Sequence, residues 1–326
     1  MPKTAVIALG GNAFTRAGQA GTYEGQIDNA VVMAHTVLAI RRFGWNVVIV
    51  HGNGPQVGNL ALQQEEGRQL VPAQPLFSLG AMTQGEIGSM ISLALHADEA
   101  DIAVAALITH VIVSRDDPAF AAPTKPIGPF FTRARAAELA AERGWTVADD
   151  SGRGFRRVVA SPRPIDVVET AAITSLLATG TVVIAGGGGG IPVARDGTGL
   201  RGVEAVIDKD HVAGRLAVSL AAQALVFVTD VPRLMLDFGQ PTERPLDEID
   251  VAEAERQLRA GQFPAGSMGP KVHAATQFVR SGGEVAVIST PDLTARTLHA
   301  TCSEPDAAAP IGTRILARRR KPRTTT

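Results

Sequence analysis

Short runs of β-branched and small apolar residues alternate along this chain with longer segments of helical period. The runs predicted to form strands are residues 4–9, 45–51, 102–113, 181–185, 203–207, 224–229 and 284–289. The helical segments between them include residues 26–42, 83–97, 166–178 and 272–281. Because helical crossovers place successive strands parallel and cover both faces of the sheet, the alternation predicts an α/β fold, a three-layer αβα sandwich with a mainly parallel open sheet. Ligands of such sheets bind beyond the carboxyl ends of the strands.

Residues 116–164 interrupt this alternation. They contain six of the 20 prolines and only short periodic pieces, with a hairpin-like pattern over residues 145–160. Because a structureless loop of this length is unusual in a compact domain, we expect a small protruding subdomain or lid here. The 326 residues, 45% of them hydrophobic, can bury a core large enough for one big α/β domain or two smaller ones. We favour a single domain over residues 1–326 that carries the inserted subdomain.

The charge balance argues against a nucleic-acid or membrane-surface protein. The net charge is −1, so no overall field attracts polyanions. We expect the basic tail, residues 317–326, to be a frayed terminus rather than a nucleic-acid arm. The single cysteine, Cys302, excludes an intramolecular disulfide and suits a reducing cytoplasm. The amino terminus enters a strand pattern directly and no apolar run is long enough to cross a bilayer, so we expect a cytoplasmic protein without a signal peptide.

Glycine-rich turns gather where the predicted strands end. The four turns are residues 10–12, 51–58, 186–190 and 266–271. Glycine lets backbone N–H groups approach an anion, and the N-terminus of a following helix adds a favourable dipole. One such turn is weak evidence, since glycine often serves only to reverse the chain. Four of them, which we place after strands of one sheet, predict an anion site at its carboxyl edge.

Two lysines lie on or beside such turns. The predicted strand 203–207 ends in the apolar run 205–207, which leads directly into Asp208, Lys209 and Asp210, and Lys271 follows the fourth turn. Buried charges must be paired or aimed at a ligand, so these residues predict a clamp for phosphate charge. From spacing alone, Lys209 fits a local ion-pair cluster that caps a helix as well as it fits catalysis. Lys271 fits an exposed helix residue, the usual environment of lysine.

Several common nucleotide and catalytic motifs are absent from the sequence. No Gly-Lys dipeptide occurs, which excludes a Walker P-loop; Gly52, Gly54 and Gly58 miss the dinucleotide-binding spacing by one residue, and no G-x-G-x-x-G follows Leu9. The metalloprotease motif H-E-x-x-H and the nucleophile motif G-x-S-x-G are also missing. The seven histidines have no metal-ligand spacing, so we expect no tightly held zinc and no dedicated metal site. What remains is phosphate handling by lysines and glycine turns outside the P-loop class.

The motifs together resemble those of carbamate kinases, and they occur in the order of that family over most of the chain. They are Gly10-Gly11-Asn12, residues 51–58, Gln84-Gly85-Glu86-Ile87-Gly88, residues 124–130, 186–192, 206–210, Thr229-Asp230-Val231 and residues 261–271. The resemblance implies the amino acid kinase fold with a protruding subdomain, and a homodimer. It also implies reversible phosphoryl transfer in which carbamoyl phosphate and ADP give ATP and carbamate, serving ATP synthesis in arginine catabolism. Mg²⁺ would enter with the nucleotide, held by phosphate oxygens and water.

The resemblance also implies roles for individual residues. Lys209 and Lys271 would stabilise the moving phosphoryl group from two sides, and Asp210 would hold both lysines without acting as a base. Lys125, at the root of the lid, would reach carbamoyl phosphate, although a solvated loop lysine is the alternative. The residues implied to bind phosphate or substrate are Gly10, Gly11, Asn12, Gly52, Asn53, Gly187 and Gly188. Those implied to lie near the nucleotide are Lys209, Asp230, Val231, Met268 and Lys271.

Two other functions stay open at this point. Another amino acid kinase, acting on a carboxylate such as acetylglutamate, would share the fold, but its first strand normally supplies a lysine near Gly10. This chain has none there, and Lys3 lies at the wrong end of the strand. A nucleotide-binding regulator without turnover is the second alternative. The presence of Lys209, Asp210 and Lys271 together argues against it.

Overall fold

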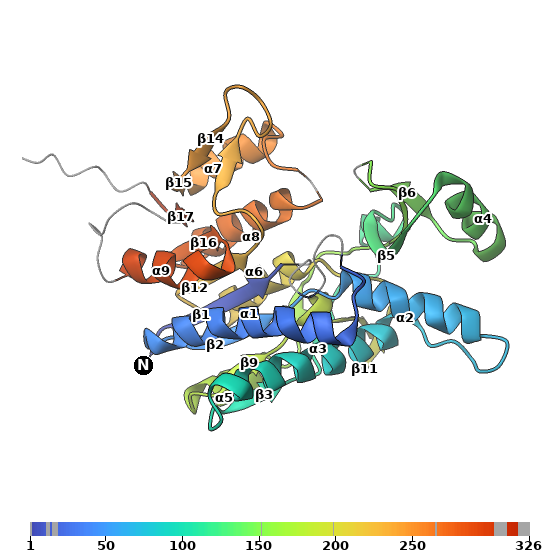
Figure 1. The fold of residues 1–326 in the computed structure, drawn as a ribbon, viewed down its shortest axis with the longest axis horizontal. Helices are drawn as coiled ribbons and strands as arrows, with labels where there is room; N and C mark the ends of the chain where they lie inside the picture. Colours follow the sequence, from blue (N-terminus) through green and yellow to red (C-terminus); the bar gives the residue numbers. More distant parts are fainter. Residues whose placement is uncertain are drawn as a thin grey trace, which may run out of the picture.

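The computed structural model describes residues 2–10, 14, 19–150, 152–197, 199–264, 266–302 and 312–318. Within these residues, eight strands form the largest sheet (Figure 1). Their order is β15 (Glu248–Asp250), β17 (Thr313–Leu316), β16 (Val285–Ser289), β12 (Ala224–Val228), β1 (Thr4–Leu9), β2 (Asn46–Val50), β9 (Val182–Ile184) and β3 (Val104–Ala106). Neighbouring strands run parallel except β16 and β17. The predicted mainly parallel α/β fold is therefore confirmed.

Helices cover both faces of this sheet, so that β1 is buried on both sides. Ala5, Ile7 and Leu9 pack into one core and Val6 and Ala8 into the other, because successive side chains of a strand point to opposite faces. The first core receives α1 (Tyr23–Arg42), α3 (Leu76–Asp98) and α9 (Pro291–Cys302). The second receives α5 (Thr170–Ala178), α6 (Lys209–Ser219), α7 (Val251–Arg259) and α8 (Met268–Arg280). Three layers result.

A second sheet stands beside the first. Its order is β11 (Gly199–Gly202), β10 (Ile191–Asp196), β4 (His110–Ile112) and β8 (Asp166–Val167). The prediction of one strand over residues 102–113 was wrong, because this stretch supplies β3 to the first sheet and β4 to the second. Between them, the Thr109 N–H donates to the side chain of Gln84 (2.7 Å) instead of to a strand. A side chain of α3 thus divides the apolar run, which periodicity alone does not reveal.

A small unit stands apart from these layers at residues 125–159 (Figure 1). It contains β5 (Lys125–Phe131), α4 (Arg133–Arg143), β6 (Val147–Asp149) and β7 (Phe155–Val159), with the strands antiparallel in the order β5-β7-β6. The predicted hairpin over 145–160 is confirmed as β6 and β7. The unit rests on α2 (Gly54–Gly67), where a Cβ on Gly58 would lie 1.9 Å from the Gly128 nitrogen. Only glycine at position 58 lets the backbone of α2 approach the backbone of β5 this closely.

Two other predicted elements differ from the structure. Residues 203–207 form no strand, and the Val206 N–H donates to the Ala160 carbonyl (3.0 Å). The helix predicted from residue 166 starts only at Thr170, because Asp166 and Val167 pair with β4. The remaining elements are the 3₁₀ turns η1 (Pro118–Phe120) and η2 (Gly187–Gly189) and the hairpin of β13 (Leu234–Leu236) and β14 (Arg244–Leu246).

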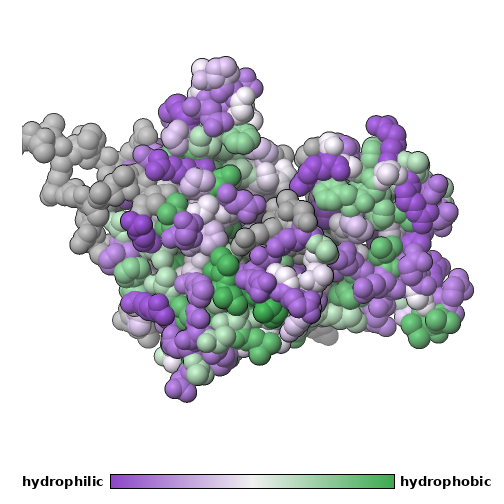
Figure 2. All heavy atoms as spheres, in the orientation of Figure 1, coloured by the Kyte–Doolittle hydropathy of each residue, from purple (hydrophilic) through white to green (hydrophobic). Residues whose placement is uncertain are grey.

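The surface of the described part is mixed in character. Figure 2 shows hydrophilic and hydrophobic residues interspersed over the visible face, with hydrophilic residues frequent on the small unit. In the part of the chain that the structure describes, no helix combines the length and apolar character needed to span a membrane. Of the basic tail predicted over 317–326, residues 319–326 lie outside the described residues.

Candidate active site

The carboxyl ends of the central strands meet at one edge of the large sheet. Gly10 follows β1, His51 follows β2 and Thr229 follows β12, all beside one another in the strand order. Gly10 packs closely, since a Cβ there would lie 3.0 Å from the Val228 carbonyl oxygen. Gly11 and Asn12, predicted to bind phosphate, lie outside the described residues.

Lys209, Asp210 and Lys271 lie together at this edge, and we call them the lysine clamp. Lys209 Nζ donates to Asp210 Oδ1 (2.5 Å), and Lys271 Nζ donates to Asp210 Oδ2 (2.9 Å). The exposed fractions of the three residues are 8%, 4% and 8%. Lys209 and Lys271 belong to the first turns of α6 and α8, which pack against each other over the sheet. The alternative of an exposed Lys271 is therefore wrong.

The clamp carries one more positive than negative charge in a buried place. Burial by itself raises the pKa of Asp210, but Lys209 and Lys271 more than offset it, so the pKa lies below its usual range. Burial, together with the charge of Lys271, lowers the pKa of Lys209. For Lys271, burial is outweighed by Asp210, and its pKa is raised. A buried excess of positive charge at the carboxyl ends of the strands suits an anionic ligand.

Asp208 joins the helix of the clamp to the small unit. Its Oδ1 accepts from the Asp210 N–H (2.9 Å), which makes Asp208 the N-cap of α6. Its Oδ2 accepts from Lys125 Nζ (2.6 Å). Burial raises the pKa of Asp208, but Lys125, His211 and Lys209 outweigh it and hold the pKa far below its usual range. The capping alternative drawn from spacing is thus correct for Asp208, while Lys209 also enters the clamp.

The five glycines 186–190 pack where larger residues would not fit. A Cβ on Gly187 would lie 2.1 Å from His51 Nε2, and a Cβ on Gly188 would lie 2.1 Å from Asn53 Nδ2. Gly188 also has a φ of 64°, which disfavours other residues. The tightness of this turn brings β2, β9 and the start of α6 into one wall of the site. Close packing by itself accounts for these glycines, and a direct contact with phosphate remains a prediction.

His51 serves packing rather than proton transfer. It is 1% exposed, and its Nδ1–H donates to the Gly52 carbonyl (3.0 Å). Burial, with a contribution from Lys209, lowers its pKa to about 4, so the ring is neutral at neutral pH. Gly52 and Asn53 lead into the N-terminus of α2, where Asn53 Nδ2 donates to Thr83 Oγ1 (2.8 Å). Because α2 follows β2 so closely, its N-terminus lies at this edge of the sheet.

Sequence reasoning gave no role to Gln84, although it belongs to a quoted motif. Gln84 is 3% exposed, and its Nε2 donates to the carbonyls of Gly187 (3.1 Å) and Thr109 (3.2 Å). It therefore holds the glycine turn against α3. The signal for this role was a polar residue on the buried stripe of a helix, which requires partners that only the fold supplies.

Comparisons with known proteins agree with this geometry. A sequence profile of the amino acid kinase family matches residues 3–289. The chain belongs to the amino acid kinase family. It is 47% identical over 304 residues to the carbamate kinase of Thermococcus kodakarensis, covering 91% of this chain and 96% of that protein. Solved structures of Giardia lamblia carbamate kinase are similar too. The structure bound to citric acid has a TM-score of 0.88 and 38% identity, and the one bound to AMP-PNP has 0.86 and 39%; each match covers 97% of this chain and 98% of the other.

Three predicted nucleotide residues of this amino acid kinase, Asp230, Val231 and Met268, lie outside the clamp but close to it in the fold. Asp230 and Val231 follow β12, and Met268 is the first residue of α8, one turn before Lys271. The negative charge of Asp230 contributes to the raised pKa of Lys271. One expectation about this region was wrong: the turn 266–271 connects α7 to α8 and does not follow a strand. The anion-binding argument for this turn then rests on the N-terminus of α8.

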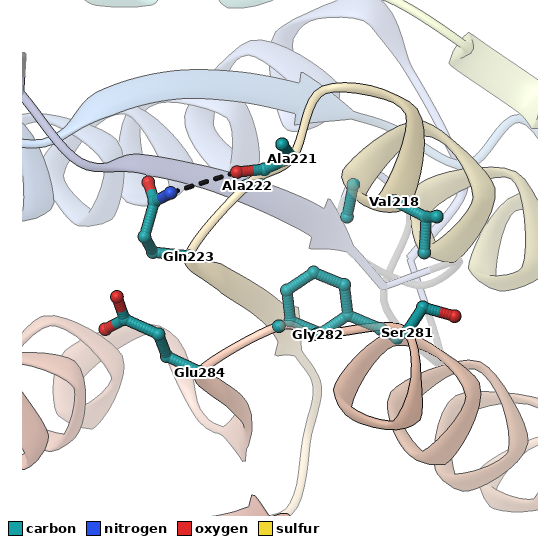
Figure 3. A pocket seen from close by; sticks show the side chains of 10 residues that line it. Val218, Ala221, Ala222, Gln223, Ser281, Gly282 and Glu284 are labelled. Carbon is teal, nitrogen blue, oxygen red and sulfur yellow. Dashed lines mark hydrogen bonds between the residues drawn. The ribbon is translucent and has the colours of Figure 1, made fainter.

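A pocket elsewhere in this amino acid kinase is not part of the clamp. It is lined by residues 221–223 and 281–284, and its Gln223 Nε2 donates to the Ala221 carbonyl (2.9 Å; Figure 3). Gln223 and Glu284 immediately precede β12 and β16, so this pocket lies at the amino edge of the sheet. Ligands of parallel sheets bind at the opposite edge, where the clamp lies.

Proposed function

We propose that this protein is a carbamate kinase that catalyses reversible phosphoryl transfer between carbamoyl phosphate and ADP. The bond between phosphorus and the carbamoyl oxygen breaks, a bond from phosphorus to a β-phosphate oxygen of ADP forms, and carbamate leaves. Both nucleophiles are anions, so neither direction needs a general base. Such a transfer depends on positioning and on neutralising the oxygen charge of the transferred group.

The lysine clamp is the observation that carries this proposal. Lys209 and Lys271 would contact the transferred group from two sides, while Asp210 holds both ammonium groups in place. The support is their burial and their contacts of 2.5 and 2.9 Å with one carboxylate. Lys125 would bring a third positive charge from the small unit, and its support is its position beside Asp208. Movement of the small unit as a lid is part of the same proposal.

The substrates would lie on the two sides of the clamp. We propose that Gly10, Gly52, Asn53 and the turn with Gly187 and Gly188 receive the carbamoyl phosphate. We also predict that Gly11 and Asn12 contact the carbamoyl phosphate. Asp230, Val231 and Met268 would lie along the nucleotide, as the similarity to a structure bound to AMP-PNP supports.

We propose that Mg²⁺ enters with the nucleotide. Among the described residues, no group of three His, Cys, Asp or Glu side chains is placed to hold a metal. Two carboxylates at the site are occupied, Asp208 by Lys125 and Asp210 by both lysines of the clamp. A site of this kind fits an ion that phosphate oxygens and water coordinate.

We further propose a cytoplasmic homodimer that makes ATP in arginine catabolism. An apolar depression on the second sheet, lined by Phe77, Ile191, Val193 and Leu200, supports a protein partner. Light scattering of the purified protein would measure the subunit number.

The test is ATP formation from ADP and carbamoyl phosphate with Mg²⁺, followed by a coupled luminescence assay. We expect turnover that requires carbamoyl phosphate and stops when EDTA removes the metal, with the ATP of quenched samples measured after excess Mg²⁺ has been restored for the luminescence reaction. Phosphorylation of acetylglutamate without use of carbamoyl phosphate would move the chain to the other kinase class. Nucleotide binding without any turnover would instead favour a nucleotide-binding regulator. The absence of a lysine beside Gly10 and the relatives named as carbamate kinases favour the first outcome.

A further inference from the structure

Lys125 forms an ion pair with Asp208, and the N-cap role of Asp208 does not explain this contact. Lys125 is the first residue of β5, at the foot of the small unit, where it pairs with Val159 of β7. Its Nζ donates to Asp208 Oδ2 at 2.6 Å, across 83 positions of sequence. The side chains of Lys125 and Asp208 are 28% and 16% exposed, so the pair is largely removed from water. Ion pairs of this burial hold their geometry better than exposed pairs do.

The second oxygen of Asp208 ties the same carboxylate to the clamp. Oδ1 accepts from the Asp210 N–H (2.9 Å), and this bond caps the helix that carries Lys209. One rigid carboxylate therefore connects the small unit, through Lys125, to the start of α6. A lysine ammonium has three N–H donors. Asp208 takes one and leaves the others for an anion.

We propose that Asp208 is a positioning residue that aligns Lys125 toward the transferred phosphoryl group and couples the small unit to the clamp. This inference rests on the substrate role of Lys125 proposed above. Without the charge of Asp208, the long side chain of Lys125 is released and must be ordered each time substrate binds. The effect is specific to the substrate that Lys125 contacts. Nucleotide binding on the other side of the clamp is expected to stay unchanged.

Asp208→Asn separates the two functions of this carboxylate. Asparagine caps a helix about as well as aspartate, but it carries no charge for Lys125. We expect the KM for carbamoyl phosphate to rise about tenfold, because the freed lysine loses its alignment, while the KM for ADP changes less than about twofold. Lys125→Met should raise the same KM, and adding Asp208→Asn to it should change nothing more. Independent, additive losses, or equal rises in both KM values, would overturn the proposal and leave Asp208 as a cap only.

A second measurement does not depend on turnover. The acetylation rate of Lys125, followed by mass spectrometry, reports how accessible its amine is. We expect the rate to rise at least about fivefold in Asp208→Asn, because the pair no longer shields the amine. Asp250→Asn is the matched control, since Asp250 caps α7 by accepting from the Glu253 N–H (2.8 Å).

The outcomes distinguish this proposal from the proposed function. Equal acetylation of Lys125 in wild type and Asp208→Asn refutes the pairing whatever the enzyme does. If the wild type makes no ATP but the labelling difference is found, the kinase function fails while the attachment of Lys125 to Asp208 stands. If ATP forms normally and Asp208→Asn matches the wild type in every KM, the positioning role fails alone.

Discussion

Replacing Asp210 by Asn tests whether one carboxylate makes the lysine clamp possible. The variant has nearly the same shape but loses the negative charge between two buried ammonium groups. The amide also presents an N–H donor where Lys209 or Lys271 now donates, so one contact becomes a meeting of two donors. We expect loss of both stability and activity.

The geometry sets the magnitude. With one ammonium on each oxygen of Asp210, the two charges are separated by ~5 Å and repel by roughly 3 kcal/mol at an effective dielectric constant of about 20. Breaking a buried pair by removing one partner costs about 3–5 kcal/mol in other proteins. Because the pKa of Lys209 is already lowered, this lysine can release its proton and limit the loss. We therefore expect the free energy of unfolding to fall by about 3 kcal/mol at pH 7.

The stability of the Asp210→Asn variant should depend on pH. In Asp210→Asn, the folded-state pKa of Lys209 lies further below its value in the unfolded chain, because its counter-charge is gone. The unfolded state then binds more protons than the folded state, and stability rises with pH in this range. Raising the pH from 7 to 9 should therefore increase the free energy of unfolding of the variant more than that of the wild type, so that part of the loss is recovered.

Urea unfolding at pH 7 and pH 9, together with the ATP assay, measures both effects. The matched control is Asp196→Asn, which removes an exposed ion pair with Arg201 and should cost less than about 1 kcal/mol. A variant as stable as the wild type at pH 7, with no gain at pH 9, would refute the role of Asp210 as the counter-charge of the clamp. Activity should fall by about a thousandfold, since the lysines lose their placement for the transition state.

Three further predictions concern the clamp and its walls. Lys271→Ala should lower turnover by about 10²–10³-fold while the fold persists, because it removes charge stabilisation of the transition state; turnover near that of the wild type would contradict this, and circular dichroism checks the fold. Gly187→Ala should destabilise the protein by roughly 3 kcal/mol through overlap with the ring of His51, whereas a Cβ on Gly67 meets nothing within 4 Å and Gly67→Ala should unfold like the wild type. His51 has a folded pKa of about 4 against an ordinary value of 6.5, so the unfolded state binds more protons between these values and stability is lost as the pH falls. Lowering the pH from 7 to 5 should cost about 2 kcal/mol through this group, and His51→Gln should lose correspondingly less in urea unfolding.

Much of the architecture was predictable because it depends on local pattern. Alternating strand and helix periodicity predicted the parallel sheet, and glycines after strands predicted its carboxyl edge as the site. The pattern failed at residues 203–207, since a segment of strand-like composition looks the same whether or not another strand lies beside it. It failed again at 102–113, where the side chain of Gln84 interrupts the pairing.

The sequence by itself determined the αβα layers and the absence of a P-loop, and it supplied the lysines and glycine turns that we propose handle phosphate charge. The resemblance to carbamate kinases implied that Asp210 holds both lysines, but the residue pattern by itself did not decide which charges meet, and the tertiary structure did. Lys271 reaches Asp210 across 61 positions because α6 and α8 pack side by side on one face of the sheet. Lys125 reaches Asp208 because the small unit stands over the start of α6. The physical reason is that secondary structure follows from short-range periodicity, while the pairing of buried charges follows from long-range packing, which no local pattern encodes.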